Sequence, residues 1–103
     1  MDVQLKKGLL DVCVLALLAR GDSYGYELIT ELSGVVEVSE STLYPILKRL
    51  EVGGLLTTYT REHGGRLRRY YRITSAGRAR LAQFDAEWAE MEKIHTFIVG
   101  GSI

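Results

Sequence analysis

The most constraining feature of the sequence is a change of pattern between residues 55 and 74. The runs LLTTYTRE (55–62) and LRRYYRIT (67–74) are rich in β-branched and aromatic residues, and HGGR (63–66) separates them. Two such runs joined by a short glycine-containing segment predict a β-hairpin. Helical patterns lie on both sides, and 103 residues are enough for one small domain. We therefore expect a single hairpin packed among helices.

Three helices are expected before the hairpin, over residues 4–20, about 24–33 and about 39–52. The segment RGDS (20–23) separates the first two, with Gly21 suited to end one helix and Asp22 or Ser23 to cap the next. Ser39 is the expected N-cap of the third helix. The first helix is apolar on a wider face than one packed side needs, so we expect a partner subunit to cover part of it.

The third helix has two distinct faces. Its apolar stripe consists of Leu43, Ile46, Leu47 and Leu50. The opposite face displays Ser41, Thr42, Pro45, Lys48 and Arg49, with Tyr44 at its margin. Pro45 is the only proline in the chain, and an interior proline costs a helix roughly 3 kcal/mol. Either it bends the helix slightly to help this outward face follow a groove, or it only limits the freedom of the unfolded chain.

A last helix is expected from Thr74 or Ser75 to about residue 99. Its apolar positions alternate in spacing between three and four, as in a heptad seam: Leu81, Phe84, Trp88, Met91, His95 and Ile98. The seam is too short for a stable free coiled coil, so it should pack on another surface. The expected fold is mainly α with a small β-hairpin (α+β). It is a winged helix-turn-helix over residues 1–74, followed by a dimerisation helix over 75–99.

Charge is distributed unevenly, although the formal net charge is zero. Residues 48–80 contain nine Lys or Arg and two Glu, whereas both flanking segments are acidic. This pattern predicts a localised anion-binding face. In a helix-turn-helix the second helix enters the DNA major groove, where hydroxyl groups contact bases or phosphates and cations contact phosphates. The third helix is therefore the expected recognition helix.

The hairpin, or wing, supplies a second basic cluster with Arg66, Arg68 and Arg69. Because strand residues alternate, Arg66 and Arg68 should share a face and Arg69 should point the other way. These arginines either contact DNA or form a flexible, solvated turn. Lys6 and Lys7, at the start of the first helix, either add phosphate contacts or are simply solvated.

Other classes of function find little support in the sequence. The one cysteine, Cys13, excludes an internal disulfide, and no spacing typical of a metal site, phosphate-binding loop or catalytic constellation is present. We therefore expect neither a cofactor nor an enzyme. The apolar stretch GLLDVCVLALLA is too short to span a membrane and contains Asp11. The expected location is the cytoplasm.

Three segments, YGYEL (24–28), STLYPILKRLEVGGLL (41–56) and RRYYRITSAGR (68–78), resemble the PadR family of bacterial transcriptional regulators in order and spacing. The resemblance runs from about Leu5 to Ile98 and is to the short subgroup with a single terminal helix. It implies a homodimeric repressor that binds a palindromic operator and is released by a small aromatic or drug-like ligand. It also places Tyr24 near the DNA backbone. The alternative is that Tyr24 and Tyr26 fill the core.

Trp88 lies in the middle of the seam, near where two such helices would meet in a dimer. Two symmetry-related indoles either sandwich a flat aromatic ligand, as the resemblance implies, or serve only as interface anchors. His95 is interpreted as a hydrogen-bonded interface residue. The alternative to a DNA-binding regulator is a winged-helix module that binds a protein partner through the terminal helix and does not recognise a DNA sequence.

Overall fold

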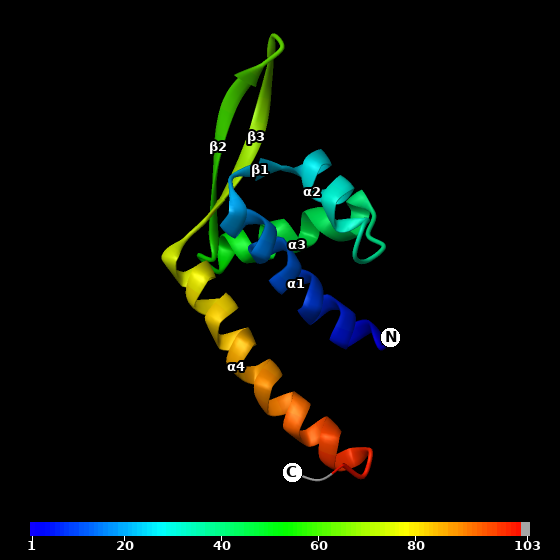
Figure 1. Cartoon of the computed structure of the whole chain (residues 1–103). Coiled ribbons are helices and arrows are strands. Elements are labelled where there is room, and N and C mark those ends of the chain that lie inside the picture. The colour runs from blue at the N-terminus through cyan, green and yellow to red at the C-terminus, as the bar shows by residue number, and fades with distance from the viewer. Residues whose placement is uncertain (102–103) are drawn as a thin grey trace.

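The structure, a computed structural model, describes residues 1–101. The elements follow in the order α1 (Val3–Arg20), β1 (Ser23–Tyr24), α2 (Gly25–Leu32), α3 (Glu40–Val52), β2 (Leu56–His63), β3 (Arg66–Ile73) and α4 (Ser75–Ile98) (Figure 1). The predicted α+β fold and the winged helix-turn-helix order of its elements are confirmed. Strand β1 was not predicted, because two residues carry no periodic pattern.

The sheet is antiparallel with strand order β1-β3-β2. Strands β2 and β3 form the predicted hairpin, paired from Leu56 with Ile73 to His63 with Arg66. Gly64 and Gly65 make its turn with φ of +59° and +80°. Both values lie in the left-handed region that a two-residue hairpin turn requires, which explains the two glycines. The hairpin projects well beyond the helices (Figure 1).

The core lies where α1, α2 and α3 meet one face of the sheet. The predicted apolar stripe of α3 is buried, each side chain being at most 3% exposed. It packs with the buried side chains of the other elements: Leu10, Val14, Leu15 and Leu18 of α1, Leu28 and Leu32 of α2, and Leu56, Tyr71 and Ile73 of the sheet. Burial of this stripe leaves the opposite face of α3 on the surface.

Helix α2 begins later than predicted, because β1 first pairs with β3. Tyr24, rather than Asp22 or Ser23, occupies the N-cap position of α2. Ser23 and Tyr24 are paired with Tyr71 and Tyr70 of β3. The alternative in which Tyr26 fills the core is wrong, since Tyr26 is 69% exposed.

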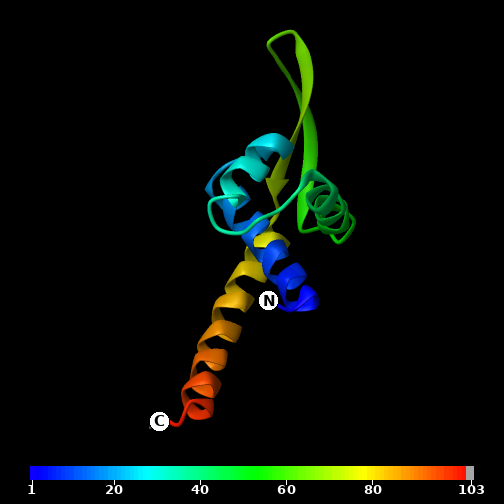
Figure 2. The same cartoon turned by 90° about the vertical axis from the view of Figure 1, so that its right-hand side faces the viewer.

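Helix α4 is attached firmly at its start and projects at its end. Thr74 caps it as predicted: its Oγ1 accepts a hydrogen bond from the Gly77 N–H at 3.1 Å and donates one to the Gly54 carbonyl at 2.7 Å. Leu81 packs against the core. The following turns leave the body on the side opposite the hairpin, as both views show (Figure 2).

Candidate nucleic-acid interface

The outward face of α3 is a continuous exposed surface. Every side chain that the sequence placed there is exposed: Ser41, Thr42, Tyr44, Pro45, Lys48 and Arg49. The helix runs without a break through Pro45. Ser39 stands at the N-cap position, but its hydroxyl bonds to those of Ser41 (2.9 Å) and Thr42 (3.2 Å) instead of a backbone N–H. A group of three hydroxyls therefore marks the start of the helix.

Helix α1 contributes two charged side chains beside this face. Asp11 forms an ion pair with Arg49 of α3. Lys7 lines a shallow pocket together with Ser41, Thr42, Pro45 and Arg49. Of the two predicted lysines, the fold thus brings Lys7 beside the outward face of α3, whereas Lys6 does not line this pocket. Lys48 forms no ion pair within residues 1–101, so its charge is available to a ligand.

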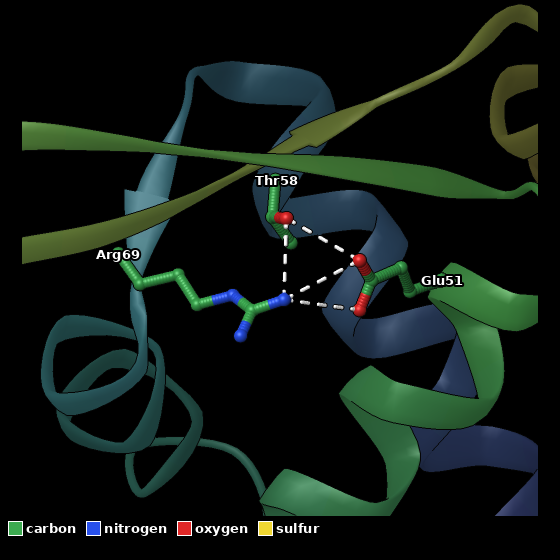
Figure 3. Close-up of polar contacts among 3 residues, drawn as sticks. All are labelled: Glu51, Thr58 and Arg69. Carbon is green, nitrogen blue, oxygen red and sulfur yellow. Dashed lines mark hydrogen bonds and ion pairs between the residues drawn. The ribbon is translucent and has the colours of Figure 1, made fainter.

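The three wing arginines lie in different environments. Strand register sets Arg66 opposite His63 at the tip, and alternation puts Arg68 on the same face and Arg69 on the other. Arg66 is exposed. The Arg68 guanidinium lies 3.9 Å from the centre of the Tyr24 ring, a cation–π contact. Arg69 turns toward α3, where its Nη2 lies 3.3 Å from both carboxylate oxygens of Glu51 (Figure 3).

A second pocket lies between the wing, α3 and the start of α2. It brings together Tyr24, Tyr44, Arg68 and Arg69, four of the predicted site residues. Gly25 is also part of its wall, and a Cβ at that position would collide with the Tyr44 hydroxyl. The absence of a side chain at Gly25 therefore lets Tyr44 lie against the start of α2. Tyr26 and Tyr71 also line it, so the pocket combines four phenols with two guanidinium groups, which suits a phosphate.

The outer face of the sheet carries an aromatic cluster that the sequence analysis missed. The Tyr59 ring stacks on Tyr70 at 5.5 Å, and Tyr24 meets Tyr70 edge-on at 5.6 Å. Asp22 accepts hydrogen bonds from Tyr59 Oη at 2.6 Å and Arg72 Nε at 3.0 Å. The bond from Arg72 lowers the pKa of Asp22, and the bond to Asp22 raises the pKa of Tyr59. This cluster braces the base of the wing.

The seam of α4 is exposed beyond its first half. Phe84 stacks on Trp88 at 6.5 Å, and the Trp88 indole N–H donates to Glu92 at 2.8 Å. Trp88 also lines a pocket with Met91, Glu92, His95 and Thr96. A groove between α1 and α4 is lined by Leu5, Leu9, Phe84, Met91 and Ile94. The predicted seam residue Ile98 is exposed, as are Ile94 and Phe97, which the strict heptad spacing had left out.

Two further kinds of feature are absent from residues 1–101. No group of three or more His, Cys, Asp or Glu residues is placed to bind a metal ion. None of the helices in this part of the chain combines the length and apolar character needed to cross a membrane. Cys13 is half-buried, and burial raises the pKa of its thiol.

Comparison with known proteins agrees with this geometry. The profile of the transcriptional regulator PadR-like family matches residues 14–83. Transcriptional regulator Rv3488 of Mycobacterium tuberculosis is 40% identical over 89 residues, which cover 85% of this chain and 80% of the relative. The chain belongs to the PadR-like family of transcriptional regulators.

Solved PadR-family structures share the fold along most of the chain. A family member from Eggerthella lenta has a TM-score of 0.84 and 32% identity, over 97% of this chain and 89% of that one. Bacillus subtilis PadR, solved in complex with operator DNA, has a TM-score of 0.69 and 26% identity. That similarity covers 74% of this chain and 46% of the Bacillus protein.

Proposed function

We propose that this PadR-family regulator binds double-stranded DNA with α3 in the major groove and the wing on the adjacent backbone. One observation carries the proposal: an exposed face of α3, rich in hydroxyl and basic side chains, stands beside a projecting hairpin that ends in two glycines and Arg66. The B. subtilis PadR complex with operator DNA supports it by family membership. A winged-helix module that binds only proteins has no need of this hydroxyl- and arginine-rich surface.

Each part of the surface has a distinct proposed role. Ser41 and Thr42 reach base edges or phosphates, and the Pro45 ring contacts a thymine methyl group. Lys48 and Arg49 bind phosphates, with Lys7 beside them and Lys6 near the same end of α1. Tyr24, Tyr44 and Arg68 line the pocket between wing and helices that suits a backbone phosphate. Arg66, at the glycine turn, reaches the backbone or the minor groove. Because hydroxyl groups discriminate bases weakly, DNA shape contributes to specificity.

We further propose that the chain acts as a homodimer joined through α4. Exposed apolar side chains run along its second half, and the groove between α1 and α4 offers a surface for a second copy. A two-fold dimer presents two α3 helices to DNA, so the operator is a palindrome with half-sites about 34–36 Å apart. Repression is proposed from the family resemblance.

An aromatic effector is proposed for the Trp88 pocket, with one indole from each subunit against a flat ligand. Trp88 is the only tryptophan, so its fluorescence reports binding directly. Trp88→Ala separates the two proposed roles of this residue. Because this variant lacks the only tryptophan, ligand binding to it is measured by calorimetry. Loss of ligand binding with an intact dimer supports the ligand site, whereas loss of the dimer supports a plain interface anchor.

The DNA proposal is tested by selecting bound fragments from total genomic DNA and measuring their affinity for a double variant, Arg66→Ala with Arg68→Ala. Affinity for the selected fragment should fall by at least about tenfold, since two phosphate contacts are removed. Arg78→Ala is the matched control, because Arg78 is an exposed arginine on α4 outside the proposed surface. Unchanged affinity of the double variant would contradict the proposed wing contacts, whereas failure of the wild-type protein to select any fragment would favour the protein-binding module.

A further inference from the structure

Glu51 has an electrostatically unfavourable position in α3. It lies in the last turn, one residue before the helix ends at Val52, where the helix dipole disfavours a negative charge. Its carboxylate is instead satisfied across the gap to the wing. Arg69 Nη2 of β3 donates to both Glu51 oxygens, and Thr58 Oγ1 of β2 donates to Glu51 Oε2, each at 3.3 Å (Figure 3).

The chain segment that joins α3 to the wing is short and contains two glycines, so it constrains their relative orientation only weakly. Gly53, Gly54 and Leu55 alone join α3 to β2. Gly54 has φ of +77°, and a Cβ built there would meet nothing within 4 Å. Backbone bonds hold the base of the connection, from Leu55 N–H to the Leu50 carbonyl at 2.9 Å and from Thr74 N–H to the Leu55 carbonyl at 3.1 Å. The Glu51 contacts join the two elements farther out along the wing.

We propose that Glu51, Thr58 and Arg69 form a strut that sets the angle between the recognition helix and the wing. Arg69 is then a positioning residue rather than a DNA contact, in contrast to Arg66. All three polar contacts of Arg69 are made by its Nη2, two of them to a full negative charge. A DNA phosphate that bound Nη2 would have to displace that carboxylate. Arg66 has no ion pair within residues 1–101 and is free to bind a DNA phosphate.

The strut rests on the proposed DNA function, and it makes predictions opposite in sign to those of a direct Arg69 contact. In Glu51→Gln the strut is weakened, so affinity for the operator should fall about three- to tenfold, as for other coupled pairs. If Arg69 were instead a phosphate ligand held back by Glu51, the same change would release it and affinity would rise.

Salt dependence provides a second measurement that a structural role does not move. Removing a phosphate contact lowers the slope of log affinity against log salt by about 0.9. Arg66→Gln should show this decrease, whereas Arg69→Gln should weaken binding and leave the slope unchanged. Equal decreases in the two variants would overturn the positioning role.

A charge reversal completes the test. Glu51→Arg and Arg69→Glu should each weaken operator binding, and the double variant should restore most of the lost affinity because the pair is rebuilt in reverse. A phosphate ligand changed to glutamate would repel DNA in either background. Failure of the double variant to recover, with melting temperature unchanged, would contradict the strut.

One measurement on the free protein is independent of DNA. Spin labels at Val52 and Leu67, which are 75% and 78% exposed, report the distance from the end of α3 to the wing. They are placed in a Cys13→Ser background and diluted with unlabelled protein. Glu51→Gln should broaden the distance distribution, and an unchanged distribution would overturn the strut. Wild-type protein that does not prefer a palindrome over random duplex would instead refute the proposed function, while the spin-label result would still judge the strut.

Discussion

At the scale of single residues, Gly77 determines how closely α4 approaches the sheet. A Cβ at this position would collide with the Leu55 carbonyl oxygen and lie 2.6 Å from Cγ1 of Ile73. The backbone carbonyl cannot move aside without disturbing the connection that leads into β2. The Gly77 N–H is also the group that Thr74 caps. The start of α4 therefore depends on the absence of a side chain here.

Gly77→Ala should lower the free energy of unfolding by about 1–3 kcal/mol, as overpacking typically does. Gly8→Ala is the matched control in α1, because a Cβ there meets nothing within 4 Å. It should gain about 0.5–1 kcal/mol from the better helix propensity of alanine. Urea unfolding followed by circular dichroism measures both, and equal effects in the two variants would contradict the packing argument.

The ionisation of Asp22 makes the free energy of unfolding depend on pH in the acid range. Its pKa is lowered mainly by the hydrogen bond from Arg72 and then by that from Tyr59. A lowered folded-state pKa means that this stabilisation is present above the unfolded value of about 4 and is lost as the pH falls through the folded value. Wild type should exceed Asp22→Asn in unfolding free energy at pH 6, and the difference should shrink toward pH 2. A difference independent of pH would show that the charge of Asp22 contributes nothing.

At the scale of elements, α3 keeps a proline in its interior and still runs without a break. The Pro45 ring faces outward, and the helix forgoes the hydrogen bond that an N–H at this position would make to the Ser41 carbonyl. The presence of a proline at this position is not explained by a stabilising contact with the core, because Pro45 is exposed.

Pro45→Ala should raise the free energy of unfolding by up to about 3 kcal/mol, the helix propensity difference. It should also weaken binding to the operator, because the proposed contact of the Pro45 ring is lost. Thermal melting and DNA titration of the same sample measure the two effects. A change in stability with unchanged affinity would mean that the proline only restricts the unfolded chain.

Local signals were sufficient to predict most elements. The stripe of α3, the glycine turn of the hairpin and the Thr74 cap each depend on neighbours in sequence, and all three were predicted. Strand β1 was missed because backbone pairing with β3, rather than its own two residues, creates it.

The polar contacts of the candidate interface required the fold. The Arg49–Asp11 pair spans 38 residues and the Arg69–Glu51 pair 18 residues. Helix and strand periodicities do not predict contacts between residues so far apart in the sequence. The heptad pattern on α4 likewise identified the seam, but not Ile94 and Phe97 beside it, because the helix presents a broader apolar face than a strict seam.

At the scale of the whole molecule, the chain is more extended than a compact domain of its length. Its radius of gyration is 15.9 Å and its extents are 59 × 27 × 21 Å. A compact domain of this length has a radius of gyration of about 13 Å. The excess comes from the wing and the end of α4, which project in opposite directions (Figure 2). One projection suits DNA, and the other suits a second copy of the chain.

Ile94→Glu should convert the proposed dimer to monomer, because two-fold symmetry buries the new charge twice at a cost of several kcal/mol. Ile94 is 53% exposed in the single chain, so folding should be unaffected. Ala89→Glu, on the opposite side of α4 by helical spacing, should leave the dimer intact. Sedimentation equilibrium at micromolar concentration measures the mass. A wild-type monomer would refute the dimer, and an Ile94→Glu dimer would exclude α4 as its interface.

In the proposed complex, two α3 helices and two wings read one palindromic site. The most direct test is a fluorescence anisotropy titration of the genomic fragment that the chain selects, against a scrambled duplex of the same composition, over a series of salt concentrations. Binding to the palindrome should be at least about 10³-fold tighter, and the affinity should fall steeply with salt. Equal affinity for the two duplexes would contradict this mode of binding.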